Sequence, residues 1–191
     1  MILKAKEKHL NDLTSLHRLV LGDTSSSKFG HEFVKNLYKT LIRYDGARVW
    51  IICNNREVFG FISVCNEIRT TTKWIKTNLK TKHYLSLIKI FIFHPKEIFN
   101  LLERIIFDTN AISKYGDYPS ILTIGISPDL QGKGEGKKLI YLVDRYFKEM
   151  KYKFYFVDTL SNNLGAIRFY ESAGFKRIFE SNGSILFKKT I

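Results

Sequence analysis

Cysteine is scarce in this chain, since only Cys53 and Cys65 occur among its 191 residues. Both fall in apolar stretches that read as strands, so we expect them to be buried as small hydrophobic side chains in a reducing compartment. A disulfide between them is therefore not expected. Clusters of Cys and His with metal-ligand spacing are also missing, which argues against a structural metal, and we expect no metal site.

Long apolar runs are missing as well. No stretch reaches the roughly 20 residues that a helix needs to span a bilayer. The first residues do not combine a basic head, an apolar run and a small-residue cleavage site, so we expect a cytoplasmic protein without a signal peptide. A composition of 45% hydrophobic and 26% charged residues is ordinary for a globular protein. The length predicts a single domain, 1–191, with a sizeable core.

Acidic residues are in short supply, with 18 Asp and Glu against 31 Lys and Arg and a formal net charge of +13. This excess predicts attraction to polyanions or to an anionic membrane surface, although a solvated lysine-rich surface would give the same count. Base-stacking aromatic patterns and DNA-binding motifs are absent, so no specific nucleic-acid partner is expected. Peripheral membrane contact stays open, as does the choice between monomer and homodimer.

What the sequence does contain is a glycine-rich turn between an apolar strand, 121–126, and an amphipathic stretch that starts near Leu139. The turn reads Gln131-Gly-Lys-Gly-Glu-Gly-Lys137. Glycines permit positive φ, and the first turn of a helix presents unpaired N–H groups that bind phosphate. The turn lies too late in the chain for a dinucleotide-binding fingerprint, and Lys138 stands where a P-loop needs Ser or Thr. We therefore predict a pyrophosphate cradle.

A second motif follows after the strand at 154–159. It reads Asn163-Leu-Gly-Ala-Ile-Arg-Phe-Tyr-Glu-Ser-Ala-Gly-Phe175. Together the two blocks, in this order and spacing, resemble the GNAT N-acetyltransferase superfamily, and they cover roughly the last third of the chain. The resemblance implies an α/β GNAT fold. Its central sheet is mixed, mostly antiparallel and of about seven strands, with the fourth and fifth strands splayed apart and helices on its faces.

The hydrophobic patterns agree with that order of elements. Strands are expected at 2–5, 49–53, 58–65, 121–126, 154–159, 176–180 and 185–188, and helices at 10–20, 33–41, 134–149 and 164–172. Gly60 inside a strand indicates a bulge or a close approach. The main departure from the family is an insert at about 69–119, which we interpret as a basic helical hairpin broken at His94-Pro95. We expect it to govern specificity, as a lid, a dimerisation surface or a helix lying on a membrane.

The resemblance also implies the cofactor, acetyl-CoA as acetyl donor, and the residues around it. The backbone N–H of Ile126 would donate to the thioester carbonyl, and Tyr170 would be the general acid for the leaving thiolate. The cofactor-binding set would be Ile124, Gly125, Ile126, Gln131, Gly132, Lys133, Gly134, Glu135, Gly136, Lys137, Asn163, Ala166, Phe169 and Tyr170.

The acceptor side is less defined. Ser27 and Phe29, in the loop before the second helix, together with Glu67 and Asp158, are the expected acceptor neighbours. Some family members carry a glutamate base early on the fourth strand, where this chain has Ser120. Glu67, Asp117, Asp158, His83 and His94 remain as candidate bases. The missing glutamate favours a weakly basic acceptor amine over lysine.

Three functions stay in view. The leading hypothesis is an N-acetyltransferase for the primary amine of a small molecule, such as an amino sugar or sugar nucleotide of surface-polysaccharide synthesis. The first alternative is a protein N-terminal acetyltransferase of the ribosomal-protein type, which would need an open groove. The second is an acyl-CoA-binding module without turnover.

Overall fold

The structure is a computed structural model that describes residues 1–22, 30–54, 57–78, 116–181 and 183–191. Two predictions lie outside the described residues. They are the acceptor neighbours Ser27 and Phe29, and the part of the insert from 79 to 115, with His83, His94 and the expected break.

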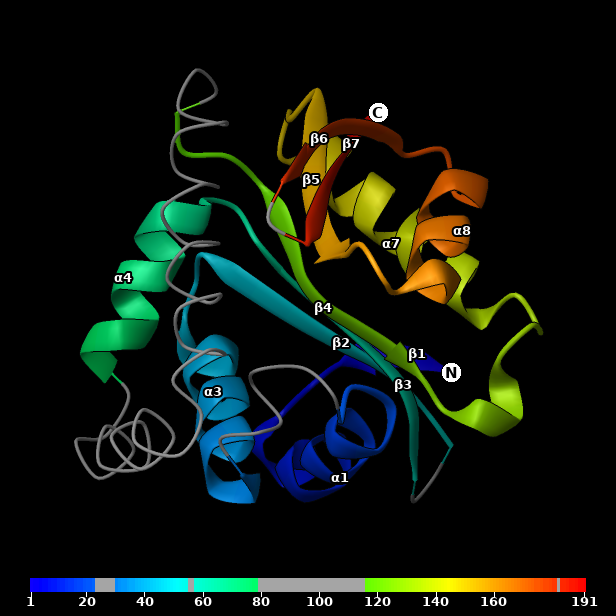
Figure 1. Ribbon diagram of the computed structural model, residues 1–191. Coiled ribbons are helices and arrows are strands. Elements are labelled where there is room, and N and C mark those ends of the chain that lie inside the picture. Colours follow the sequence, from blue (N-terminus) through cyan, green and yellow to red (C-terminus); the bar gives the residue numbers. More distant parts are fainter. Residues whose placement is uncertain (23–29, 55–56, 79–115, 182) are drawn as a thin grey trace.

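The described strands form one seven-stranded sheet in the order β1-β2-β3-β4-β5-β7-β6 (Figure 1). The strands are β1 (Ile2–Lys4), β2 (Ala47–Cys53), β3 (Val58–Cys65), β4 (Ser120–Ile126), β5 (Phe154–Leu160), β6 (Lys176–Ser181) and β7 (Ser184–Thr190). All neighbours are antiparallel except β4 and β5, which run parallel. The sheet is therefore mixed and mostly antiparallel, which confirms the expected fold class.

Helices cover both faces of the sheet (Figure 1). They are α1 (Leu10–Val20), α3 (His31–Arg43), α4 (Ile68–Asn78), α7 (Glu135–Glu149) and α8 (Leu164–Ser172). Buried side chains of α1 and α3 form one core with β2 and Phe61, which we name the α1 core. Those of α7 and α8 form a second core with β5 and β7, the α7 core. Among the described helices, none is both long and apolar enough to cross a bilayer.

The insert begins with α4, which directly follows β3. The carboxylate of Asp117 accepts hydrogen bonds from the backbone N–H groups of Arg69 and Thr70, at 2.8 and 3.0 Å. It thus satisfies first-turn donors of this helix. Trp74 of α4 stacks on Tyr44, with ring centroids 4.9 Å apart. Asp117, a candidate base in the sequence, therefore holds the insert against the sheet.

Strand β4 carries a bulge that its sequence does not reveal. Ser63 of β3 pairs with Thr123 and Val64 pairs with Ile121, so Leu122 has no partner in β3. An extra residue turns two consecutive side chains to one face of a sheet. Leu122 accordingly packs in the α1 core, and Thr123 contacts Tyr38 of α3 on that same face.

The parallel strands β4 and β5 separate along their length. They pair at a single register position, Ser120 with Phe156. The Ser120 hydroxyl donates to the Phe156 carbonyl at 3.1 Å, and the Phe156 N–H donates to the carbonyl of Pro119. Beyond this junction the two strands diverge, which confirms the expected splaying. We name the gap between them the wedge.

Candidate active site

Backbone groups of β4 face the wedge. The N–H of Ser127 donates to the Phe59 carbonyl at 2.7 Å, so Ser127 points its backbone groups toward β3. Since direction alternates along an antiparallel strand, Gly125 also faces β3, whereas Ile124 and Ile126 face the wedge. These two residues therefore offer backbone groups to an extended ligand lying between β4 and β5.

Gly125 itself is required for packing. A Cβ atom there would lie 2.6 Å from side-chain atoms of both Phe61 and Val20. Its predicted place beside the cofactor therefore reflects its position between Ile124 and Ile126, and its backbone bonds belong to the sheet.

The loop after β4 presents a row of N–H groups. Gly132 and Gly134 have φ of 75° and 82°, a conformation that favours glycine, and a Cβ at either position would meet nothing within 4 Å. Gly134 is the N-cap of α7. Within the described residues, no hydrogen bond uses the N–H groups of Gly132, Gly134 or the first three residues of α7. This open cradle lies at the wide end of the wedge.

Three other residues of the predicted cradle have structural contacts. The Gln131 side chain donates to the Ile126 carbonyl at 3.1 Å, which joins the loop to the end of β4. Gly136 faces α8, where a Cβ would lie 2.8 Å from the Phe169 ring. Glu135 forms an ion pair with Lys138, so its carboxylate is partly neutralised beside the cradle. The third glycine of the motif thus allows α7 and α8 to approach each other.

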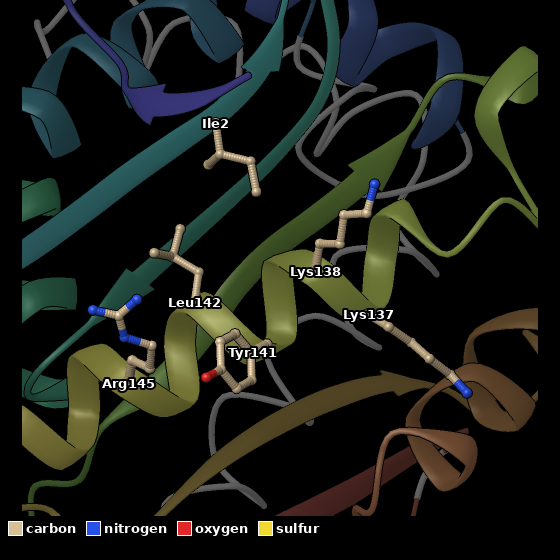
Figure 2. A pocket seen from close by; sticks show the side chains of 6 residues that line it. All are labelled: Ile2, Lys137, Lys138, Tyr141, Leu142 and Arg145. Atoms are coloured by element: carbon tan, nitrogen blue, oxygen red, sulfur yellow. The ribbon is translucent and has the colours of Figure 1, made fainter.

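Cations gather on the exposed side of α7. An open pocket of about 530 Å³ lies between this helix and Ile2 of β1. Figure 2 shows Lys137, Lys138 and Arg145 extending from α7 at its border. Neither β4 nor Tyr170 lines the pocket, so it is not the acceptor cleft. The cations instead add to the positive potential around the N-terminus of α7.

Asn163 is the N-cap of α8. Its Oδ1 accepts a hydrogen bond from the Ala166 N–H at 3.0 Å, and the side chain is exposed. Within the described residues its amide NH₂ group makes no hydrogen bond. The cap fixes the side chain while its donors remain available for a carbonyl of the pantetheine arm.

The two roles of Asn163 predict separable effects. Asn163→Ala should lower the free energy of unfolding by about 1 kcal/mol, because the cap is lost. Asn163→Asp keeps a cap oxygen but removes both donors, so stability should persist while coenzyme A binds several-fold more weakly. Urea unfolding and calorimetry measure the two quantities. If both variants bind coenzyme A as tightly as the wild type does, Asn163 only caps α8 and does not contact the cofactor.

Tyr170 is 5% exposed and packs in the α7 core against Phe169, Phe175 and Phe187. Its hydroxyl makes no hydrogen bond with any residue that the structure describes. Burial, with a smaller effect of the Asp158 charge, raises the pKa of Tyr170 above its ordinary value of 10.0. The phenol therefore keeps its proton at neutral pH and has a donor to offer.

The acceptor neighbours separate in space. Asp158 lies on β5 beyond the junction with β4, half-buried and near enough to Tyr170 to affect its pKa. Glu67 is exposed in the turn between β3 and α4, at the Ser120 end of the sheet, where the wedge is closed. The structure thus brings Asp158 to Tyr170 and leaves Glu67 apart. In the described residues, β4 carries no carboxylate.

A buried hydrogen-bonded chain was missed by the sequence analysis. His17 Nδ1 lies 2.8 Å from the Tyr38 hydroxyl, which lies 3.1 Å from Thr123 Oγ1, and Ser63 Oγ lies 2.6 Å from Thr123 Oγ1. The four residues come from α1, α3, β4 and β3. Burial lowers the pKa of His17 from 6.5 to about 4, so its imidazole is neutral at physiological pH. The apolar stripes of α1 and α3, which contain His17 and Tyr38, were the available signal.

The lowered pKa of His17 makes stability depend on pH. In the unfolded chain His17 binds a proton below about pH 6.5, whereas in the folded chain it does so only near pH 4. Stability should therefore fall as the pH falls through this window, by about 2 kcal/mol at pH 5. Urea unfolding at neutral and acidic pH measures the loss. His17→Gln should lack this pH-dependent loss of stability. If stability falls with pH in that variant as steeply as in the wild type, His17 is not the cause of the loss.

Known proteins provide the comparison. The profile of the Acetyltransferase (GNAT) family matches residues 13–175. Among solved structures, a protein of Pyrococcus horikoshii OT3 has 17% identity and a TM-score of 0.64, over 100% of this chain and 98% of its own. PaiA N-acetyltransferase of Thermoplasma acidophilum, in complex with coenzyme A, has 12% identity and a TM-score of 0.63. The match covers 100% of this chain and 98% of that protein. The ribosomal-protein-S18-alanine N-acetyltransferase of Escherichia coli has 13% identity and a TM-score of 0.59, and the match covers 100% of this chain and 93% of that protein.

No curated protein matches the chain in sequence. The profile nevertheless defines the class of protein: an acetyltransferase, a class whose acetyl donor is acetyl-CoA. Because the profile spans most of its length, the chain belongs to the GNAT acetyltransferase family. The resemblance drawn from the two glycine-containing motifs is confirmed.

Proposed function

We propose that this chain transfers the acetyl group of acetyl-CoA to the primary amine of a small molecule. The observation that carries the proposal is the row of N–H groups of Gly132 and of residues 134–137, which lies open at the wide end of the wedge. Such a row suits a diphosphate, and the wedge suits the extended arm attached to it. The sheet runs from Ile2 to Thr190, which supports treating 1–191 as one domain.

In this proposal each part of the cofactor has a partner. The backbone of Ile124 and the N–H of Ile126 pair with the pantetheine arm like an added strand, and the Ile126 N–H polarises the thioester carbonyl. Asn163 donates its amide to the arm from the α8 side. Lys133 and Lys137 add positive charge to the diphosphate site.

Tyr170 acts as the acid. The neutral acceptor nitrogen attacks the thioester carbon, the carbon–sulfur bond breaks, and the departing thiolate takes the phenolic proton. The nitrogen releases one proton to water, and the Tyr170 phenolate regains one from water. Burial raises the pKa of Tyr170. A thiolate that forms in the same apolar surroundings is raised in pKa by the same cause, which keeps the transfer balanced.

The acceptor is an amine of low basicity. Neutralising a lysine-like amine with a pKa near 10.4 takes about 4.6 kcal/mol at pH 7, whereas an amine with a pKa near 8 takes about 1 kcal/mol. In the described residues β4 has no carboxylate, and Asp117 and Ser120 are committed to structural bonds. An amino sugar, whose oxygen substituents withdraw electrons from the amine, meets this requirement, and a sugar nucleotide carrying such an amine does so too.

A protein N-terminus is the second candidate, since an α-amine is also weakly basic. The E. coli enzyme of the same fold acts on ribosomal protein S18, as its name states. A peptide acceptor would require an open groove beside the wedge.

Release of free thiol from acetyl-CoA tests the candidates, with amino sugars, amine-bearing sugar nucleotides, peptides and polyamines as acceptors. Release with an amino sugar or sugar nucleotide supports the proposal, and release with peptides alone favours the N-terminal alternative. Tight binding of acetyl-CoA without release to any amine would instead identify a non-catalytic binding module and contradict the proposed reaction.

A further inference from the structure

The chain formed by His17, Tyr38, Thr123 and Ser63 reaches solvent at one member. His17, Tyr38 and Ser63 are each 0% exposed, whereas Thr123 keeps part of its surface accessible. Buried polar groups are usually hydrogen-bonded to one another, so Thr123 is the member of this chain that a molecule from solvent can reach.

The bulge in β4 is what places Thr123 there. Because Leu122 has no partner in β3, Leu122 and Thr123 both lie on the face covered by α1 and α3. With strict alternation, Thr123 would have pointed into the α7 core beside Ile121. Thr123 also directly precedes Ile124, whose backbone faces the wedge. The hydroxyl is therefore held beside the part of β4 whose backbone faces the wedge.

Thr123 lies on the face of β4 opposite the α7 core. The opposite face is filled by the α7 core, in which Val157 of β5 and Ile167 and Tyr170 of α8 are buried. The partly accessible Thr123 hydroxyl lies on the other face, so an acceptor that enters the wedge from that face passes Thr123.

The direction of the hydrogen bonds follows from their chemistry. A phenol is a stronger donor than an imidazole N–H, and a neutral imidazole nitrogen is a stronger acceptor than a phenolic oxygen. Burial keeps His17 neutral with a pKa of about 4 and raises the pKa of Tyr38. Tyr38 therefore donates to His17 Nδ1, and Thr123 donates to Tyr38.

Ser63 then donates to Thr123, whose hydrogen is already used. One lone pair of Thr123 Oγ1 remains, and donation to Tyr38 makes this oxygen a better acceptor. A lone pair at an opening binds a donor such as an amine N–H.

We propose that Thr123 accepts a hydrogen bond from the amino group of the acceptor, and that Tyr38 and His17 are positioning residues that keep its lone pair available. The proposal rests on the proposed acetyl transfer, because its ligand is the acceptor amine of that reaction. It assigns the acceptor nitrogen a polar contact that the sequence did not predict.

Two coenzyme A conjugates test this contact without turnover. One carries an N-ethylacetamide group on sulfur and presents an N–H at the acceptor nitrogen. The other carries ethyl acetate and has an oxygen there. By calorimetry, the wild-type protein should prefer the amide by about tenfold, the effect of one hydrogen bond. Thr123→Val should bind both conjugates equally, and Thr123→Ser should retain the preference.

Tyr38→Phe should reduce the same preference, because the Thr123 hydrogen then loses its acceptor and can turn outward. Thr40→Val, on α3 but outside the chain of hydrogen bonds, is the matched control and should change nothing. Coenzyme A alone should bind all variants alike. A Thr123→Val protein that still prefers the amide overturns the assignment, whereas failure of coenzyme A to bind even the wild type overturns the proposed function itself.

Discussion

Replacing Gly134 with glutamate is expected to abolish the binding of coenzyme A while the chain stays folded. Gly134 has a φ of 82° and is the N-cap of α7. A side chain there strains the backbone by roughly 1–2 kcal/mol, and a carboxylate would occupy the place proposed for the diphosphate. Together with repulsion between the two anions, the loss of affinity should be at least about 100-fold. Calorimetric titration with coenzyme A measures it.

Gly30 provides the matched control. It is the N-cap of α3, has a φ of 87°, and a Cβ there would also meet nothing within 4 Å. Gly30 has a ψ of 171°, against −2° for Gly134, so Gly30→Glu places the same charge and at least as much backbone strain at the start of another helix. Coenzyme A should bind this variant as it binds the wild type. If Gly134→Glu and Gly30→Glu bind coenzyme A with equal affinity, the diphosphate does not bind at the loop after β4.

Tyr170→Phe should lower kcat by about 10²–10⁴-fold, the usual contribution of a general acid, and leave the affinity for coenzyme A unchanged. Within the described residues the Tyr170 hydroxyl has no hydrogen-bond partner to lose, so stability should also be preserved. Steady-state kinetics with the acceptor identified in the amine panel gives the first quantity, and calorimetry and urea unfolding give the others.

Tyr155→Phe separates catalysis from packing. Tyr155 is fully buried on β5, and its hydroxyl donates to Asp144 at 2.7 Å. Its removal should cost about 1–2 kcal/mol of stability, because a carboxylate loses its donor, with turnover retained. If Tyr170→Phe also lost only stability and kept its rate, Tyr170 would be a packing residue and another donor would protonate the thiolate.

Much of the fold could be predicted because its signals are local. The stripe and the cap residues of α8 fix a helix at Leu164–Ser172, the range expected from the sequence. The apolar strands on either side of Asn54 predict a hairpin, and Gly60 indicates the irregular pairing that β2 and β3 do show beside it. The glycines of the cradle are equally local, since Gly132 and Gly134 need only their own positive φ.

Features that depend on distant pairing could not be predicted. All of Ser120–Ile126 except Ser120 and Thr123 is apolar or glycine, so nothing in the strand reveals a bulge at Leu122, which its register with β3 creates. Tyr38 and Thr123 are 85 positions apart, and each alone fits an ordinary buried residue. The structural role of Asp117 is equally hidden in the sequence, because its partners, the first N–H groups of α4, lie 47 and 48 residues earlier. Asp117 therefore stood among the candidate bases.

The central claim is that backbone N–H groups after β4 bind the diphosphate of coenzyme A. Titration of ¹⁵N-labelled wild-type protein with coenzyme A, followed by amide NMR spectra, observes these groups one by one. The account predicts that the largest shifts belong to Gly132, Gly134 and Gly136, and that Gly30 and Gly183 do not move. Saturable binding that leaves the amides of residues 132–137 unshifted would contradict it.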